Sequence, residues 1–486
     1  MRMRREFFRI SKHARTYDRQ TCKFTINIKY ETAAPEPSER VVAVAEGFGL
    51  GLDQYERFVV YDDVELKIGQ ADVVYVSGDS GSGKSVLLRA LEKDIACDMK
   101  RNSINVADVK PESGKPLIET VGKTVEEGIE LLNRVGLGDA FLYLRVYEQL
   151  SDGQKFRYKI ARMMESQVQF WIMDEFAATL DRDTAKIVAY NLQKLARQQG
   201  KAVLAATTHT DLFEDLKPSV QIHKRYGKEI TVKYYPNEPT KQCSLVKEMR
   251  VEEGTTKDWR ELAAFHYRSH RIAAPRKIFC LKRGDELCGV IVYCYPPVTS
   301  FGRRLVLPKM SMKELNEKLS VISRVVVHPK YRTIGLGEKL VRDTLELAST
   351  EYVEMSAVMA KYNPFAEKAG MKKIVEQQPP KEALYITRIL QQQGFNLQLL
   401  GSERYVLSRL QALDDGDILK IREAFLKQRH TRFMKSFSYH LPFGTKDAYV
   451  KEIMAADLNK LANLIRICGF LMQTKVYLFW EKERGK

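Results

Sequence analysis

The sequence is poor in cysteine and tryptophan and has no long hydrophobic run. Its seven cysteines are an odd number, lie far apart and include no C-x-x-C pair, so neither a disulfide framework nor a thiolate zinc site is indicated. No stretch approaches the roughly 18 consecutive apolar residues of a membrane helix, and the start "MRMRREFFRISKHAR" lacks the apolar segment of a signal peptide. We therefore expect reduced thiols, no membrane segment and a cytoplasmic location.

The charge is strongly positive, with a net value of +17. Residues 1–30 carry nine Lys or Arg against only Glu6 and Asp18, which indicates a basic N-terminal arm. An excess of this size attracts polyanions such as nucleic acid. A solubilising surface would explain the same charge.

Length and periodicity predict an α/β multidomain protein. A chain of 486 residues is longer than a single hydrophobic core usually accommodates. Strand-like and helical segments alternate as in a parallel sheet covered by helices. Strand-like runs begin with "RVVAVAEGF" at Arg40. The expected segments are a basic arm (1–39), an α/β domain (40–236), a linker (237–244), a second, α+β domain (245–400) and a basic, mainly helical C-terminal region (401–486).

The stretch "YVSGDSGSGKSVLLRAL" is an apolar strand, a glycine-rich turn and the start of a helix. The pattern Gly78-x-x-x-x-Gly83-Lys84-Ser85 is a P-loop, in which backbone amides of the turn face phosphate oxygens, the lysine reaches the β and γ phosphates and the serine binds Mg²⁺. Ser80 and Gly81 lie within the same turn. The sequence therefore predicts an ATP and magnesium site.

Four further motifs follow in a fixed order: "LSDGQ" from Leu150, "WIMDE" ending in Asp174 and Glu175, "ATLD" ending in Asp181, and His209 after the run "AVLAATT". With the P-loop, they resemble the ABC-type ATPase family over roughly residues 40–235. Asp152 departs from that family, where glycine is commoner. The glutamine that usually contacts a transport partner has no clear counterpart, and the aromatic residue that stacks on adenine could be Tyr55, Phe58 or Tyr61.

The resemblance implies a role for each motif. Asp174 would join Ser85 around magnesium, Glu175 would act as the general base on the attacking water, and His209 would contact the γ phosphate. In this family the signature segment of one copy closes on the nucleotide of the other. The working ATPase would thus be a homodimer, completed in trans by Ser151, Gly153 and Gln154, with Asp181 at the interface.

A second phosphate-type turn lies in "SRVVVHPKYRTIGLGEKL", where Arg332-x-x-Gly335-x-Gly337 separates a strand from an amphipathic helix. Amides at such a turn can bind a diphosphate, and the arginine adds charge. With the later "KYNPFAEKAGMKKI", this segment resembles the acetyl-CoA-binding core of GNAT acyltransferases, over roughly residues 245–388. The resemblance implies that acetyl-CoA contacts Val326, Val327, Arg332, Thr333, Ile334, Gly335, Leu336, Gly337 and Asn363.

The catalytic acid or base of this second domain is less clear. The tyrosine frequent in the family is not in register, because Phe365 and Ala366 occupy its place. In the polar stretch "FHYRSHR", His266 could deprotonate an acceptor amine near neutral pH, assisted by Tyr267. The same stretch could instead be a solvated helix end.

The whole chain resembles fusions of an ABC-type ATPase to a GNAT acetyltransferase. We expect an ATP-hydrolysing, acetyl-CoA-dependent N-acyltransferase that acts on RNA or DNA. One alternative is a protein lysine acetyltransferase with a regulatory ATPase, and another is a non-catalytic clamp in which ATP gates nucleic-acid binding.

Overall fold

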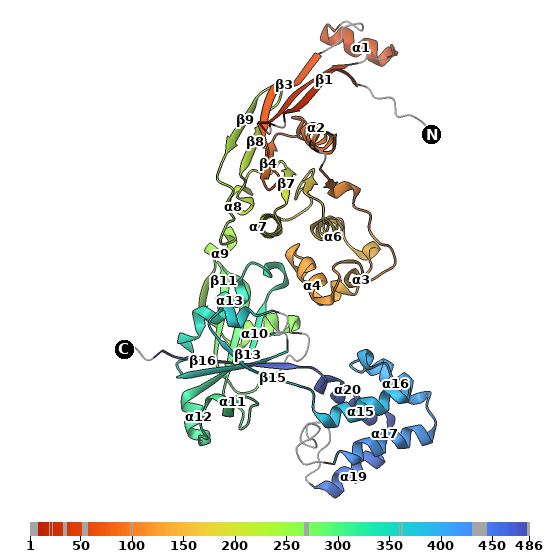
Figure 1. Cartoon of the computed structure of the whole chain (residues 1–486), viewed down its shortest axis with the longest axis vertical. Helices are drawn as coiled ribbons and strands as arrows, with labels where there is room; N and C mark the ends of the chain where they lie inside the picture. The colour runs from red at the N-terminus through yellow and green to blue at the C-terminus, as the bar shows by residue number, and fades with distance from the viewer. Residues whose placement is uncertain are drawn as a thin grey trace. The chain divides into compact units, whose positions relative to one another are not determined.

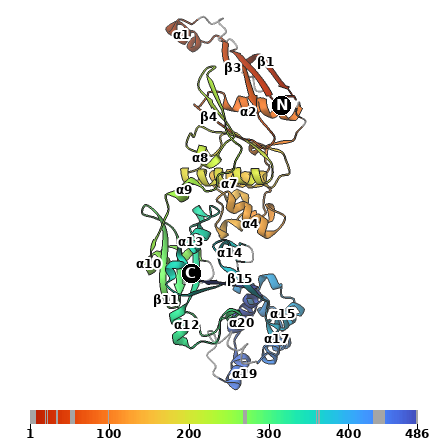
Figure 2. The same cartoon turned by 60° about the vertical axis from the view of Figure 1, so that its left-hand side comes forward.

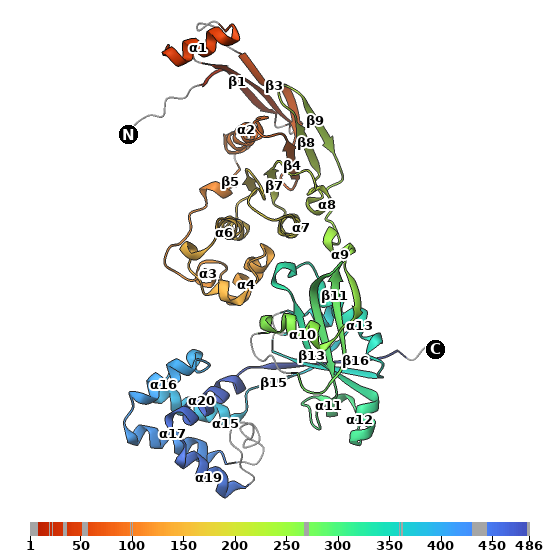
Figure 3. The same cartoon turned by 180° about the vertical axis from the view of Figure 1, so that it is seen from behind.

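The computed structural model describes residues 8–18, 20–21, 23–32, 36–50, 57–97, 99, 101–266, 272–358, 360, 363–429 and 445–483. It divides into two compact units, which we treat separately. The first comprises residues 1–270, 279–290 and 326–340, and the second comprises residues 271–278, 291–325 and 341–486. Figures 1, 2 and 3 show the elements of both.

Two sheets precede residue 240 in the first unit. One is antiparallel, in the order β1-β2-β3, and the other has the order β5-β6-β7-β4-β8-β9 and is parallel except for the last pair. The strands are β1 (Phe8–Asp18), β2 (Lys23–Thr32), β3 (Arg57–Lys67), β4 (Val73–Gly78), β5 (Ser103–Asn105), β6 (Phe170–Met173), β7 (Ala202–Ala206), β8 (Val220–Lys224) and β9 (Ile230–Tyr234).

Both faces of the parallel sheet are covered. Val73 and Tyr75 of β4 pack into one apolar core with α6 (Asp152–Met164) and α7 (Arg182–Gln198). Val74 and Val76 pack into another with α2 (Lys84–Cys97) and β2. Alternate residues of a strand point to opposite faces, so a strand buried on both faces is apolar throughout. This arrangement confirms the expected parallel sheet with covering helices.

Helices α2, α6 and α7 pack against the parallel sheet, and Figure 2 shows α4 beside α7. The α-helices of the described chain up to residue 262 are α1 (Glu39–Phe48), α2 (Lys84–Cys97), α3 (Leu117–Thr120), α4 (Val125–Arg134), α5 (Ala140–Tyr143), α6 (Asp152–Met164), α7 (Arg182–Gln198), α8 (Phe213–Leu216), α9 (Ser244–Lys247) and α10 (Thr256–Leu262). Short 3₁₀ helices are η1 (Val106–Asp108), η2 (Tyr147–Gln149), η3 (Ala263–Phe265) and η4 (Pro329–Tyr331).

The N-terminal part differs from the sequence-based expectation. Residues 8–18 and 23–32, assigned above to a basic arm, form β1 and β2, and β2 pairs with β3. The strand expected at "RVVAVAEGF" is wrong, because this segment is α1. Ser38 caps its N-terminus by accepting a hydrogen bond from the Val41 amide at 3.3 Å, and Gly49 ends it at φ 62°.

The segment expected as a linker is held to the first unit at both ends. Asn237 Oδ1 accepts a hydrogen bond from Arg197 at 2.9 Å. Ser244 donates to buried Asp215 through its amide at 2.8 Å and its hydroxyl at 2.6 Å. Residues 237–244 are therefore anchored to the preceding fold by specific hydrogen bonds.

The second large sheet has the strand order β10-β11-β12-β13-β14-β16-β15. Pairing of β13 with β14 is parallel, and pairing of β16 with both of its neighbours is antiparallel. The strands are β10 (Arg250–Glu253), β11 (Pro275–Arg283), β12 (Glu286–Cys294), β13 (Leu319–Val327), β14 (Tyr352–Ala357), β15 (Lys372–Gln377) and β16 (Lys475–Glu481).

The C-terminal region is mostly helical, as expected, but ends in β16. The run "KVYLFWE" is rich in aromatic and β-branched residues, and Val476, Tyr477 and Leu478 are fully buried. β16 lies between β14 and β15, strands that precede it by about a hundred residues. A helical group containing α15, α16, α17, α19 and α20 thus interrupts this sheet in the sequence.

Figure 3 shows that helical group gathered together, around a core that includes Leu390, Phe425, Tyr449 and Ile465. The helices of this part are α11 (Arg303–Val306), α12 (Met312–Lys318), α13 (Leu336–Thr344), α14 (Phe365–Lys368), α15 (Lys381–Gln392), α16 (Glu403–Gln411), α17 (Asp415–Lys427), α19 (Lys446–Ala455) and α20 (Leu458–Leu471), with short 3₁₀ helices η5 (Glu346–Ala348) and η7 (Leu397–Leu399).

The cysteines of the described residues are free thiols, and all of these except Cys97 are buried. Over the same residues, no helix is long and apolar enough to cross a membrane. Nor do three or more His, Cys, Asp or Glu side chains there form a group able to hold a metal ion.

A buried ion pair fixes α11 to the sheet in the second unit. Arg303 donates to both carboxylate oxygens of Glu354, at 3.0 and 2.6 Å, and the Tyr477 hydroxyl donates to the same carboxylate at 2.7 Å. The side chains of Arg303 and Glu354 are only 8% and 2% exposed. Each partner therefore satisfies a charge that water does not reach.

Replacing Glu354 by Gln should lower the free energy of unfolding by about 3 kcal/mol, because a buried guanidinium loses its counter-charge. Denaturant unfolding followed by tryptophan fluorescence measures this change. The matched control is Glu65→Gln, which removes an exposed pair with Lys23 and should change the value by less than about 1 kcal/mol. Equal effects of the two substitutions would contradict the expected role of burial.

Candidate functional site

The phosphate-binding turn follows β4, and its glycines adopt backbone angles that other residues avoid. Gly78, Gly81 and Gly83 have φ values of 139°, 74° and 100°. A Cβ on Gly78 would lie 1.9 Å from the Lys224 carbonyl oxygen, and one on Gly83 would lie 2.5 Å from Val60 Cγ1. A Cβ on Gly81 would meet no atom within 4 Å, so the turn is open on that side.

Lys84 begins α2 and turns back over this loop. Its ammonium donates to the carbonyls of Gly78 at 2.8 Å and Asp79 at 2.5 Å. Burial lowers the pKa of Lys84, and the nearby carboxylate of Asp174 opposes that shift. Ser85 follows in the first turn of the same helix, and Ser80 is exposed in the turn itself.

Residues beneath the turn support it. Tyr61, fully buried on β3, donates from its hydroxyl to the Gly83 carbonyl at 3.0 Å, and the Lys224 ammonium lies 5.3 Å from the centre of the Tyr61 ring. Tyr61 is therefore a buried support for the loop and unable to stack on an adenine. Phe58 is half-buried, and Tyr55 lies outside the described residues.

The carboxylates predicted for catalysis lie where β6 ends. Asp174 is half-buried and accepts a hydrogen bond from the Glu175 amide at 3.1 Å, while the Glu175 side chain is exposed. Glu175 and Ala177 have φ values of 51° and 62°. Non-glycine residues rarely adopt such angles, and strained backbone of this kind clusters at functional sites.

His209 follows the neighbouring strand β7. Its backbone carbonyl accepts a hydrogen bond from the Tyr75 hydroxyl, and its Nδ1 contacts the guanidinium of Arg182. Its Nε2 is buried and has no hydrogen-bond partner among the described residues. An unsatisfied buried nitrogen is costly, and a phosphate oxygen would satisfy it. The residues present therefore fit a bound nucleoside triphosphate with magnesium.

The residues expected to act in trans cap two helices. Ser151 and Gln154 form a reciprocal capping box at the start of α6, with distances of 3.4 and 3.0 Å. Gly153 is needed there because a Cβ would lie 3.1 Å from the Thr179 carbonyl oxygen. Asp181 caps α7 by accepting from the amide and hydroxyl of Thr184 at 3.1 and 2.6 Å.

The second phosphate-type turn joins η4 to α13. Val326, Ile334 and Leu336 are buried, so their side chains anchor the loop. Gly335 is exposed at φ 88°, and an added Cβ would meet no atom within 4 Å. Thr333 has φ 72°, which is unusual for a β-branched residue. The amides around Gly335 are thus presented on an open, strained turn, a geometry that fits a diphosphate.

Further predicted acyl-CoA contacts lie elsewhere on this part of the chain. Val327 and Gly337 are half-buried, and Asn363 is exposed shortly before α14. In the second unit, pairing of β13 with β14 ends at Ile322 and Met355, although β13 continues beyond that point. Strand edges that part in this way can accept an extended ligand.

The candidate base His266 is half-buried and packs edge-to-face with Trp259 at 6.0 Å between ring centres. Tyr267 lies outside the described residues. A second histidine, His328, was not singled out from the sequence. It packs edge-to-face with Phe265 at 5.0 Å, and burial lowers its pKa. The position of His328 shortly before the Arg332 motif could have identified it as a candidate from the sequence.

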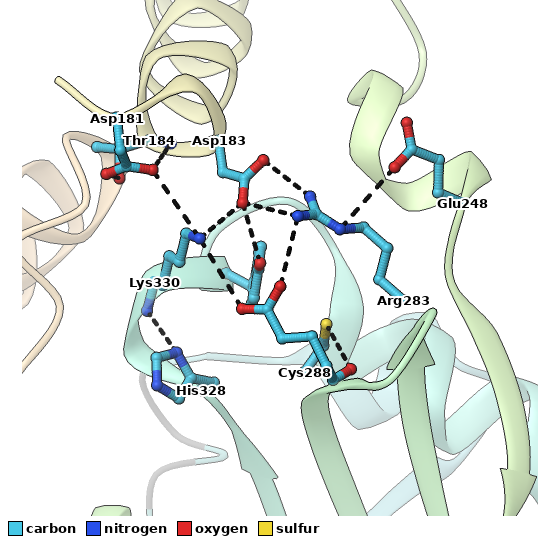
Figure 4. A network of polar contacts seen from close by, with 10 residues as sticks. Asp181, Asp183, Thr184, Glu248, Arg283, Cys288, His328 and Lys330 are labelled. Carbon is cyan, nitrogen blue, oxygen red and sulfur yellow. Dashed lines mark hydrogen bonds and ion pairs between the residues drawn. The ribbon is translucent and has the colours of Figure 1, made fainter.

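A cluster of charged residues beside this turn also escaped the sequence analysis (Figure 4). We call Asp183, Arg283, Glu286, Lys330 and Tyr331 the Asp183 cluster. The Asp183 carboxylate on α7 accepts from Arg283 at 2.9 and 2.8 Å, from Lys330 at 2.6 Å and from the Tyr331 hydroxyl at 3.2 Å. These segments all belong to the first unit.

Comparison with known proteins agrees with this geometry. Methionine import ATP-binding protein MetN 1 of Shouchella clausii is 26% identical over 218 residues, which cover 37% of this chain and 62% of that protein. MetN of Streptomyces coelicolor is 28% identical over 204 residues, 34% of this chain and 57% of that protein. The chain thus spans about three fifths of the length of these relatives. The model of the acetyltransferase (GNAT) family matches residues 243–370.

The chain joins an ABC-type ATPase domain to a GNAT-family domain. Among solved structures, the dimeric structure of a bacterial ABC transporter cassette is 20% identical, has a TM-score of 0.30, and covers 37% of this chain and 92% of that one. The GNAT match begins within α9's N-terminal flank and ends before β15. It therefore contains the Arg332 turn, whereas the glycine turn at Gly78 lies in the ATPase domain.

Replacing Gly83 by Ala in the ATPase domain should weaken ATP binding at least tenfold. The added methyl would lie 2.5 Å from Val60 Cγ1 at φ 100°, so the loop has to shift. Isothermal titration with ATP and magnesium measures the affinity. The control is Gly200→Ala, which introduces strain at φ 64° but meets no atom within 4 Å. Unchanged ATP affinity in the Gly83 variant would contradict the predicted fit.

Proposed function

We propose that the chain is an ATP-hydrolysing, acetyl-CoA-dependent N-acyltransferase that acts on nucleic acid. The observation that supports this proposal is the presence of two open phosphate-type turns in one chain. A Cβ added to Gly81 or to Gly335 would meet no atom within 4 Å. The first turn is associated with Lys84, a residue suited to a triphosphate. The second is followed by a helix N-terminus suited to the diphosphate of coenzyme A.

In the ATPase reaction, Glu175 accepts a proton from water as the water oxygen attacks the γ phosphorus and the bond to the ADP oxygen breaks. Ser85 and Asp174 would hold a magnesium ion, which would supply positive charge next to the phosphates. His209 donates from Nε2 to a γ-phosphate oxygen. Residues Ser151, Gly153 and Gln154 of a second copy close the site, with Asp181 at the homodimer interface.

In the transfer reaction, an acceptor amine attacks the thioester carbon and the carbon–sulfur bond breaks, releasing the thiol of coenzyme A. His266 accepts the amine proton, and backbone groups of Val326 and Val327 hold the acyl carbonyl. His328 is a second candidate base, because its lowered pKa keeps it neutral at neutral pH. Tyr267 is the candidate acid that protonates the departing thiolate.

The acceptor is inferred from charge. A net charge of +17 favours binding of a polyanion, and contacts between basic side chains and phosphates weaken steeply with salt. The free thiols of the described residues fit a reducing compartment, so we place the reaction in the cytoplasm.

Replacing Glu175 by Gln should lower the rate of ATP hydrolysis at least about 100-fold, since a positioned general base typically contributes that much, with ATP affinity changed less than about threefold. Phosphate release and ATP titration separate the two quantities. With ATP present, light scattering should show a stable dimer. The control Glu130→Gln removes an exposed carboxylate on α4 and should leave hydrolysis unchanged. Wild-type turnover by the Glu175 variant would rule out this assignment.

Incubation with [¹⁴C]acetyl-CoA, with and without ATP, identifies the acceptor among total RNA, genomic DNA and cell protein. We expect label in a nucleic-acid pool, and a His266→Ala variant should label it at least tenfold more slowly. Label only in protein would move the target to lysine side chains. Label in no pool, with acetyl-CoA still bound, would leave an ATP-gated clamp without transferase activity.

A further inference from the structure

Helix α7 contacts residues of both candidate sites. Arg182, in its first turn, contacts Nδ1 of His209, the residue that faces the γ phosphate in the proposed function, and also pairs with Asp211. Asp181 caps the same turn. Asp183, two residues after Asp181, lies in the Asp183 cluster, and Asp181 itself lies 3.9 Å from Lys330 of that cluster (Figure 4). Adjacent residues of one helical turn therefore serve the two sites.

The Asp183 cluster holds the entrance of the acyl-CoA loop. Lys330 and Tyr331, which both donate to Asp183, directly precede Arg332. Burial by itself would raise the pKa of Asp183, but hydrogen bonds from Arg283 and Lys330 outweigh it and hold the pKa well below its usual range. The carboxylate is thus a charged, multiply bonded anchor, since charge-assisted and bidentate contacts are the stronger kind.

A second contact from α7 reaches the strained residue of the loop itself. Asn191, almost fully buried, donates from Nδ2 to the Thr333 hydroxyl at 2.8 Å and to the Arg134 carbonyl at 2.9 Å. Thr333 is the residue with φ 72°, a conformation that persists only where neighbours fix it. Asp183 and Asn191 lie eight residues apart, a spacing that places both on one side of a helix.

The residue expected to bind the diphosphate is also engaged by the ATPase domain. Arg332 donates to the carbonyl of Gly138, and Thr333 donates to the carbonyl of Asn133 at 3.4 Å. A diphosphate at this loop would compete with the Gly138 carbonyl for the Arg332 guanidinium. Binding at the loop and packing of the loop against the ATPase domain are therefore linked.

Resting on the proposed function, we propose that Asp183 and Asn191 are positioning residues of the acyl-CoA site, and that α7 couples occupancy of the nucleotide site to acyl-CoA binding. The helix is a rigid element. If nucleotide binding moves the backbone at Asp181 or Arg182, the side chains of Asp183 and Asn191 therefore move with it. Such coupling is reciprocal, because each ligand changes the affinity of the other by the same factor.

Isothermal titration of the full-length Glu175→Gln protein with acetyl-CoA, with and without saturating ATP and magnesium, tests the proposal. We expect the two dissociation constants to differ by about fivefold or more, the usual lower range for coupled sites, and the ATP affinity to change by the same factor when acetyl-CoA is bound. Adding Asp183→Asn should bring both factors close to one. Its matched control is Glu229→Gln, which removes an exposed pair with Arg225 outside both candidate sites and should retain the factor.

The outcomes separate the two proposals. Acetyl-CoA binding with the same dissociation constant in both conditions would overturn the coupling and leave the proposed transferase intact. Failure of acetyl-CoA to bind in either condition would overturn both. Loss of the factor in the Glu229 variant as well would remove Asp183 from the explanation. The first two outcomes compare the Glu175→Gln protein with and without ATP. They therefore do not depend on the folding of the Asp183 variant.

Discussion

The backbone of two short turns imposes the main constraint on this chain. To point several amides at one anion, a chain has to adopt positive φ, which glycine accepts and other residues adopt only with strain. Gly83 and Gly335 meet this demand directly. Thr333 meets it at a cost of about 1–3 kcal/mol. Sheets buried on both faces and fixed hydrogen bonds, such as that from Tyr61 to Gly83, hold the strained conformations in place.

Features that depend on local sequence could be predicted from it. The glycine turn at Gly78, the carboxylates after β6 and the Arg332 turn each combine a strand, a spacing and a following helix within a few residues. The parallel sheet followed from apolar runs, because strands buried on both faces have no polar alternation. The break in pattern at residues 237–244 predicted a linker, but it gave no sign that Ser244 is hydrogen-bonded to Asp215.

Features set by distant pairing could not be predicted in the same way. β16 is short and lies next to a basic helical region, and only its pairing with β14 and β15 makes it a sheet strand. The basic composition of the N-terminal residues masked β1 and β2, of which β1 pairs with β2 and β2 pairs with the distant β3. On α7, Asp183 looks like an ordinary acidic residue of a solvated helix start. Its importance comes from Arg283, Lys330 and Tyr331, about one hundred or more residues away.

The basic composition has a structural component that bears on nucleic-acid binding. Several cations bind backbone carbonyls instead of carboxylates: Arg422 donates to Ile453, Met454 and Ala456 at the end of α19, and Lys224 donates to the carbonyls of Arg225 and Gly227. Such contacts satisfy helix ends and turns without cancelling charge. The excess of Lys and Arg therefore overstates the number of cations available to a phosphate backbone. The slope of binding affinity against salt concentration would reflect only the cations that contact phosphates from the surface.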